Sequence, residues 1–161
     1  MSAAMKSGEA LCVQHSRLKD RLAQVQALAG SLRSGEPEAA AAVMKEVLRF
    51  LECEVQPHAE WEERVLYPLL DRRLGRGRAF TATLRYEHRV IDRWITELAR
   101  EAARHTPDLL AFARRTDKVL GVLEAHFEAE EEVLPPALEG IPLEEQSLYP
   151  HSHRGWGAWE R

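Results

Sequence analysis

Histidine and glutamate recur at one spacing in two similar stretches of the chain. One stretch, HAEWEERVLYP, begins at His58, the other, HFEAEEEVLPP, begins at His126, and about seven of eleven positions agree. Each contains His-x-x-x-Glu, which pairs His58 with Glu62 and His126 with Glu130. Residues four apart share a helix face, so each pair can direct an imidazole and a carboxylate toward one point. Both pairs lie on apolar stripes, where a carboxylate must be paired or bound to a metal.

His15 and His88 occupy the same kind of stripe position on the other two predicted helices. Each of the four helices therefore directs one histidine toward the interior. At 1.5 Å per residue, Glu62 and His88 lie about 18 and about 16 Å from the turn between them, so their levels match. The levels of His88 and His126 also match, whereas those of His15 and His58 differ by about one turn.

Four histidines and two interior carboxylates favour a transition metal over calcium or magnesium. These six ligands are more than a single tetrahedral zinc ion uses. If both glutamates bridge two metals, the six side chains supply about eight of the roughly twelve bonds that two six-coordinate ions need. The remaining positions are open to oxo, water or a small exogenous ligand, and iron is the natural metal for such a site.

The elements that must position these side chains are helices, because apolar residues recur every three or four positions and no useful length alternates at period two. Apolar stripes mark helices over residues 11–32, 43–69, 80–98 and 119–137. Short glycine and proline connections imply antiparallel neighbours. We therefore predict an all-α fold, an antiparallel up-down-up-down four-helix bundle over residues 1–139, followed by a C-terminal tail over residues 140–161.

Prolines and polar residues indicate where the predicted helices bend, begin and end. Pro57 lies inside the second helix and predicts a kink just before the histidine that follows it. Thr106 is the expected N-cap of the fourth helix, because a first-turn proline and an acid follow it. Pro135 and Pro136 should end or disturb the last turn of that helix.

Composition excludes several classes of function. The 161 residues include 22 basic and 26 acidic side chains, a net charge of −4, which argues against nucleic-acid binding. No apolar run approaches the roughly 20 residues that span a membrane, and no secretory signal is visible, so we expect a soluble cytoplasmic protein. Cys12 and Cys53 form no redox or zinc motif and are expected to be buried as small apolar side chains.

The order of a histidine, His-x-x-x-Glu, a second histidine and a second His-x-x-x-Glu resembles the hemerythrin-like (HHE cation-binding) domain over roughly residues 8–138. The resemblance implies a non-haem centre of two iron ions, oxo- or hydroxo-bridged, in which both glutamates bridge. The metal ligands that it implies are His15, His58, Glu62, His88, His126 and Glu130.

Two positions depart from the oxygen-carrying hemerythrins. The carriers have a histidine where this chain has Asp92, and an aspartate where it has Glu131. The resemblance is therefore to the broader hemerythrin-like group, whose members are linked to sensing of oxygen, nitric oxide, peroxide or iron and to iron–sulfur repair. It implies a small diatomic or peroxide ligand and names no protein partner.

Three other functions remain open at this point. One is a non-catalytic iron or redox sensor whose metal occupancy orders the bundle, and another is a metal-free helical interaction module, against which the interior ligands argue. A ferritin-like di-iron oxidase uses Glu-x-x-His, and no histidine of this chain follows a glutamate at that spacing. Glu87 and Asp92 are expected to orient a ligand imidazole or to lie at the surface. The tail histidines, His151 and His153, receive no role.

Overall fold

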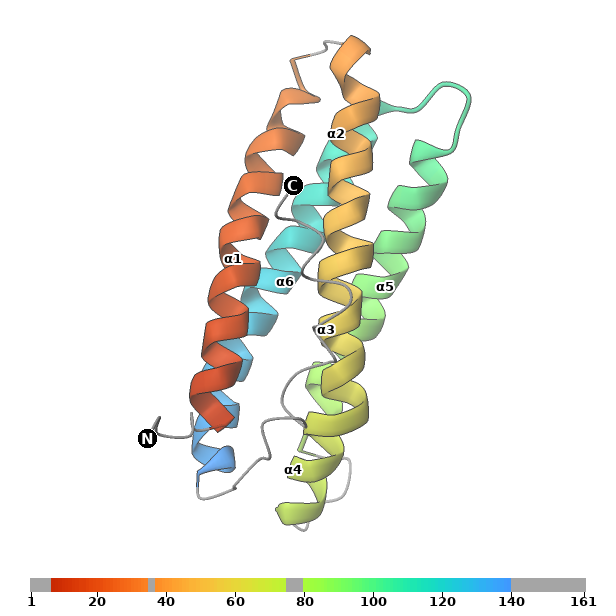
Figure 1. Ribbon diagram of the computed structural model, residues 1–161. Coiled ribbons are helices and arrows are strands. Elements are labelled where there is room, and N and C mark those ends of the chain that lie inside the picture. The colour runs from red at the N-terminus through yellow and green to blue at the C-terminus, as the bar shows by residue number, and fades with distance from the viewer. Residues whose placement is uncertain (1–6, 35–36, 75–79, 140–161) are drawn as a thin grey trace.

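The computed structural model describes residues 7–34, 37–74 and 80–139, which form four helical rods that run alternately up and down (Figure 1). The predicted all-α bundle is confirmed, and the described residues contain no strand. The predicted tail, with His151 and His153, lies outside the described residues. The helical segments are α1 (Ser7–Ser31), α2 (Pro37–Phe50), η1 (Leu51–Val55), α3 (Gln56–Trp61), η2 (Glu62–Leu66), α4 (Tyr67–Arg73), α5 (Ala82–Ala102) and α6 (Leu109–Leu138).

The segments from α2 to α4 follow one another without a break and make up the second rod. Helix α1 packs against α6 and α2, and α5 packs against the same two helices, so the rods enclose one interior. None of the described helices combines the length and the apolar character needed to cross a membrane.

Buried apolar side chains form two clusters, one toward each end of the bundle. The larger cluster includes Phe50, Leu98 and Phe112, and the smaller one includes Leu70 and Leu134. In every rod, the predicted ligand histidine lies between a residue of the smaller cluster and a residue of the larger cluster along the chain. The flanking pairs are Leu11 and Leu18 for His15, Val55 and Trp61 for His58, Leu84 and Ile91 for His88, and Leu123 and Leu134 for His126. The bundle therefore holds a polar layer between two apolar ones.

Two π-helical segments widen the second rod around the layer of histidines. The segment η1 ends one residue before the turn that contains Pro57, and η2 ends in the same relation to Pro68. Since proline lacks an N–H and clashes with the preceding turn of an α-helix, a wider turn accommodates it. The structure thus has a π-helical segment where the sequence predicts a kink.

The prolines expected to end or disturb the last turn of α6, Pro135 and Pro136, do lie in that turn, and the helix ends at Leu138. The expected N-cap of α6 is wrong. Its N-cap is Asp108 and not Thr106: the Asp108 carboxylate accepts a hydrogen bond of 2.9 Å from the Ala111 N–H.

The expectation that both cysteines are buried is also wrong, since Cys12 and Cys53 are exposed. Cys12 follows the buried Leu11, and a step of one residue turns its side chain about 100° away from the interior. Cys53 lies between the two inward residues of η1, Leu51 and Val55. Helices α1 and α6 approach closely at Gly8, because a Cβ added there would lie 3.0 Å from Pro135 Cβ.

Candidate metal centre

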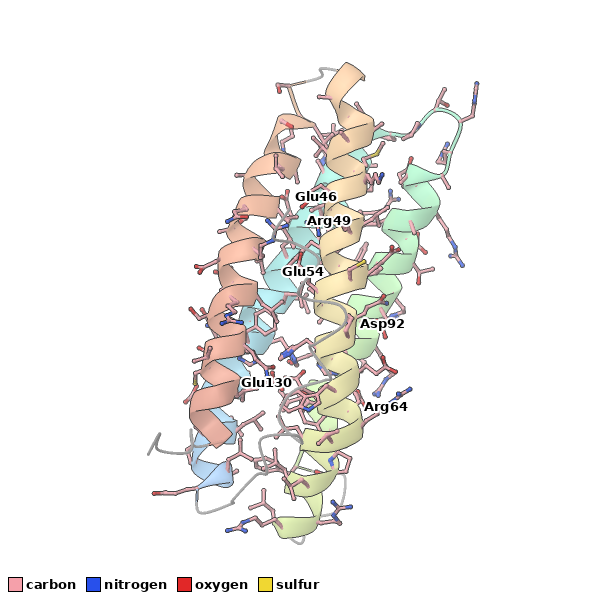
Figure 2. The ribbon with its side chains drawn as sticks, in the orientation of Figure 1. Glu46, Arg49, Glu54, Arg64, Asp92 and Glu130 are labelled. Atoms are coloured by element: carbon pink, nitrogen blue, oxygen red, sulfur yellow. The ribbon has the colours of Figure 1, made fainter. Side chains whose placement is uncertain are left out.

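All six predicted ligands are buried and lie together in the layer between the apolar clusters, and none is more than 5% exposed. Their ligand atoms form two overlapping groups with the spacing of metal sites. The first group is His15, His58, Glu62 and Glu130, and the second is Glu62, His88 and His126. His15 and His58 meet in this layer, although the sequence predicted that their levels along the bundle differ by about one turn. Glu130 lies among the rods in Figure 2.

The first group brings two imidazoles against one edge of the two carboxylates. The Nε2 atoms of His15 and His58 are 3.1 Å apart. Glu62 Oε1 lies 2.9 Å from His58 Nε2 and 3.6 Å from His15 Nε2. Glu130 Oε2 lies 3.3 Å from His15 Nε2. Two nitrogen and two carboxylate ligands therefore surround one point.

The second group repeats this arrangement with the other two histidines. The Nε2 atoms of His88 and His126 are 2.9 Å apart. Glu62 Oε2 lies 3.3 Å from His88 Nε2, and Glu130 Oε2 lies 3.4 Å from His126 Nε2. Each half of the layer thus offers two imidazole nitrogens and access to both carboxylates.

The two glutamates span the layer in different ways. Glu62 directs Oε1 toward His58 and Oε2 toward His88, so its two oxygens serve the two groups. Glu130 directs one oxygen, Oε2, toward both groups, while its Oε1 accepts a hydrogen bond of 2.5 Å from the Tyr67 hydroxyl. The equivalence that the repeat suggests for the two carboxylates is therefore not complete.

Polar atoms without hydrogen bonds indicate what the layer is built to hold. Both oxygens of Glu62 and Oε2 of Glu130 are buried and accept no hydrogen bond, although histidine nitrogens lie 2.9–3.6 Å away. Buried carboxylate oxygens are otherwise almost always paired, because an unpaired one costs several kcal/mol. Nitrogen lone pairs and carboxylate oxygens that converge in this way fit metal cations, and the mixed nitrogen and oxygen set suits iron.

Acidic side chains contact the outer nitrogen of three of the four imidazoles. Glu87 Oε2 is hydrogen-bonded to His126 Nδ1 at 2.8 Å, and Glu63 Oε1 to His88 Nδ1 at 3.2 Å. Glu131 Oε1 lies 3.5 Å from His15 Nδ1 without a hydrogen bond. At His88 and His126, the hydrogen-bonded carboxylate keeps the proton on Nδ1 and leaves the Nε2 lone pair directed inward, as in carboxylate–histidine–metal arrangements.

Without metal, burial and neighbouring charges shift the pKa values of histidine and glutamate side chains in the layer in opposite directions. Burial opposes the charged form of His15, but the neighbouring carboxylates of Glu130 and Glu62 outweigh it and raise the pKa of His15 to about 9. Burial raises the pKa of Glu130, and the neighbouring charge of Glu62 adds to this effect. Burial also acts on Glu62, yet the charge of His58 and the other imidazoles lower its pKa. The pKa values of the two carboxylates are thus shifted in opposite directions, and bound cations would favour the anionic form of both.

Sequence reasoning missed several residues around the layer. Tyr67 is fully buried, and its hydroxyl bonds Glu130 and lies 3.4 Å from His88 Nε2. The repeat could have pointed to Tyr67, because the two similar stretches differ at this position: the second stretch has Pro135 where the first has Tyr67. Glu63 and Arg85 were also missed, whereas the interpretation of Glu87 as a partner of an imidazole is confirmed. Asp92 instead accepts a hydrogen bond of 3.1 Å from Gln56 near the surface.

Comparison with known proteins identifies the family of the chain. The hemerythrin HHE cation binding domain matches residues 9–138, which includes the six buried residues and all four rods. Neither the comparison with curated proteins nor that with solved structures gave a match. The match covers most of the chain, and the family is defined by cation binding, to which the buried histidines and glutamates are suited. The chain belongs to the hemerythrin HHE cation-binding domain family.

Proposed function

We propose that this chain is a non-haem di-iron protein that binds or reduces a small oxidant, such as oxygen, peroxide or nitric oxide. In this proposal the metal ligands are His15, His58, Glu62, His88, His126 and Glu130. The observation that carries it is Glu62, whose two buried oxygens accept no hydrogen bond and face different pairs of histidines. A carboxylate in that position has the geometry of a bridge between two cations.

The protein's own residues would prepare this centre in three ways. The acids hydrogen-bonded to Nδ1 of His88 and His126 orient these imidazoles, and Glu131 lies beside Nδ1 of His15. The large and small apolar clusters close the layer from both ends, which keeps bulk water away from it. The hydroxyl of Tyr67 provides a buried hydrogen-bond donor beside Glu130 and His88.

Iron bound here would supply electrons or an open coordination position to a small oxidant. Six protein ligands do not fill the coordination shells of two ions, so this proposal includes positions for an exogenous ligand. The size of that ligand is restricted because every proposed protein ligand is at most 5% exposed.

The test is metal analysis of protein produced with iron, followed by visible spectra of the oxidised, reduced and nitric oxide- or peroxide-treated forms. We expect about two iron ions per chain and charge-transfer bands that change with each treatment. Protein that is colourless and binds one zinc ion, or none, would contradict the proposal. Consumption of peroxide or nitric oxide with an added reductant would indicate catalysis, whereas binding without turnover would favour a sensor.

A further inference from the structure

Arg85 is a buried cation beside the candidate metal centre that the proposed function leaves without a role. It lies on α5, three residues before His88, and is 6% exposed. Its Nη2 donates to Asp71 at 3.2 Å, and its Nε donates to the Thr81 hydroxyl at 3.0 Å. The Thr81 hydroxyl in turn donates to Asp71. These bonds fix the guanidinium between the end of α4 and the start of α5.

The other side of the same guanidinium reaches toward the centre. Its Nη1 donates to Glu63 Oε2 at 2.7 Å, while the second oxygen of Glu63 is 3.2 Å from His88 Nδ1. Arg85 Cζ also lies 5.1 Å from the centroid of the Tyr67 ring, which stacks on His88 with centroids 5.5 Å apart. Arg85 therefore contacts both side chains that flank His88.

The three acids at the imidazoles are held to very different degrees. Glu63 is bound by the buried Arg85, whereas Glu131 is bound at 2.7 Å by Lys19, whose side chain is 33% exposed. Glu87 has no Lys or Arg partner among the described residues. A planar guanidinium with several fixed donors restricts its partner more than a flexible, hydrated ammonium does. Of the three imidazoles, His88 thus has the most firmly fixed acid.

We propose that Arg85 is a positioning residue for the metal centre. By holding Glu63 against Nδ1 of His88, it fixes the orientation of His88 in the Glu62–His88–His126 group. This inference rests on the proposed function, because it concerns metal binding at the same layer. It predicts that loss of Arg85 weakens one of the two metal positions and leaves the His15–His58 position nearly unchanged.

The experiment follows the removal of iron by a chelator from wild-type protein and from Arg85→Gln. Loss of a side chain that orients a metal-bound imidazole typically weakens metal affinity by about 10–100-fold. Iron in Arg85→Gln should therefore leave in two steps, the first at 10–100-fold lower chelator concentration, with about one ion retained. Removal that matches the wild type, or equal weakening of both ions, would overturn the inference.

The matched control is Arg89→Gln on the same helix. Arg89 is exposed and lies 5.7 Å from the ring of Tyr86, a surface counterpart of the Arg85–Tyr67 pair. Arg89→Gln should release iron as the wild type does. Arg85→Lys keeps the charge but cannot reach Asp71, Thr81 and Glu63 at once, so we expect a smaller shift than that of Arg85→Gln.

A double-mutant cycle with Glu63→Gln separates positioning from a merely structural role. If Arg85 acts through Glu63, the double variant should weaken the affected ion no further than the stronger single variant does. Additive losses would overturn the inference. Circular dichroism of each metal-free variant checks folding, and if Arg85→Gln does not fold, the cycle is carried out with Arg85→Lys. Wild-type protein that binds no iron would refute the proposed function itself, a different outcome from equal behaviour of wild type and variants.

Discussion

The two halves of this bundle use the same helical period for opposite purposes. In the half that contains the larger apolar cluster, inward positions carry residues such as Val47, Leu98 and Phe112. In the other half, the inward positions between the clusters carry histidine or glutamate, such as His126 and Glu130. The first half gains its stability chiefly from apolar burial. The second half buries carboxylate oxygens that accept no hydrogen bond, so the stability of its histidine layer depends on bound cations.

This contrast indicates that fold and centre are supported separately. A chain that relied on metal for its whole core would unfold without it, as small metal-dependent domains do. Here the larger cluster joins all four rods, since it includes residues of α1, the second rod, α5 and α6. We therefore expect the bundle to persist without metal, with the loss confined to the layer of histidines.

The largest effect should come from the apolar half. Phe112 is fully buried in the larger cluster, and Phe112→Ala removes that packing and leaves a cavity. We expect the free energy of unfolding to fall by about 3–5 kcal/mol in both metal-free and metal-loaded protein. Denaturant unfolding measures both. Leu110→Ala is the control, because Leu110 is 45% exposed on the same helix and should change stability by less than about 0.5 kcal/mol. A cost confined to the metal-loaded form would contradict the separation.

The next effect concerns the choice between two adjacent acids on α6. Glu130 faces both pairs of histidines, whereas Glu131 is 29% exposed and, among the imidazoles, contacts only the outer nitrogen of His15. Glu130→Ala should lower iron below two per chain and weaken the charge-transfer bands, with affinity reduced by more than about a hundredfold. Glu131→Ala should cost about tenfold or less, the lower range for a side chain that only orients a ligand. Iron quantification decides between them, and the reverse order would show that Glu131 is the ligand.

Much of this centre could be predicted from sequence because its signal is local. Residues four apart share a helix face, so the doubled His-x-x-x-Glu predicted two inward pairs. Rotation explains the choice of Glu130, since one further residue turns Glu131 about 100° away. Helix rise placed His88 level with Glu62 and with His126, and the structure brings these three into one group.

Other features of the centre depend on contacts between distant parts of the chain, and the periodic pattern of the sequence does not indicate these contacts. Counting with α-helical rise left an offset between His15 and His58, yet their Nε2 atoms lie 3.1 Å apart, and the π-helical segment η1 lies between the first loop and His58. Arg85 looks like an ordinary surface arginine in sequence, and only the arrangement of Asp71, Thr81 and Glu63 accounts for its burial. The exposed cysteines show the same limit, because residue type alone suggested burial.

Removal of the metal should produce an effect that is confined to the layer. Ligand binding stabilises a native state by about 2.7 kcal/mol when the free ligand is at a hundred times its dissociation constant. Metal-free protein should therefore melt earlier, and its amide hydrogens should exchange faster in α3, η2 and the last third of α6. Exchange in α2 and in the start of α6 should stay nearly unchanged. Equal melting temperatures in matched buffer would contradict an interior metal site, and faster exchange throughout would contradict the independence of the apolar half.

A smaller effect is expected from the hydroxyl that distinguishes the two carboxylates. Tyr67→Phe keeps the buried ring but removes the donor to Glu130 Oε1. We expect a loss of about 1.5 kcal/mol in the free energy of unfolding, as for other hydrogen bonds to charged groups. Tyr86→Phe is the control, because Tyr86 is 55% exposed. Denaturant unfolding of both variants measures the difference, and equal stability would indicate that the hydroxyl contributes nothing to the layer.

The smallest effect should come from the surface of the apolar half, where Figure 2 places Glu46, Arg49 and Glu54 far from Glu130. Hydrogen bonding from Arg49 lowers the pKa of Glu46 from 4.5 to about 2, burial opposes this shift, and Arg21 adds to it. A lowered pKa in the folded state means that the stabilisation is complete above about pH 4.5 and is lost as the pH falls toward 2. Because Glu46 is 31% exposed, solvent screening limits its contribution to less than about 1 kcal/mol.

Glu46→Gln tests this sign directly in metal-free protein, where the acid-labile centre does not interfere. The variant should be less stable than the wild type by up to about 1 kcal/mol at pH 7, and the difference should shrink between pH 4.5 and 2. Subtracting the two unfolding curves at each pH removes the contributions of all other carboxylates, since both proteins share them. Glu52→Gln provides the control, because Glu52 is exposed on the same rod and has no ion pair among the described residues. A variant at least as stable as the wild type at pH 7 would mean that the Glu46 anion contributes no stability, and that the arginines around it do not stabilise this half of the bundle.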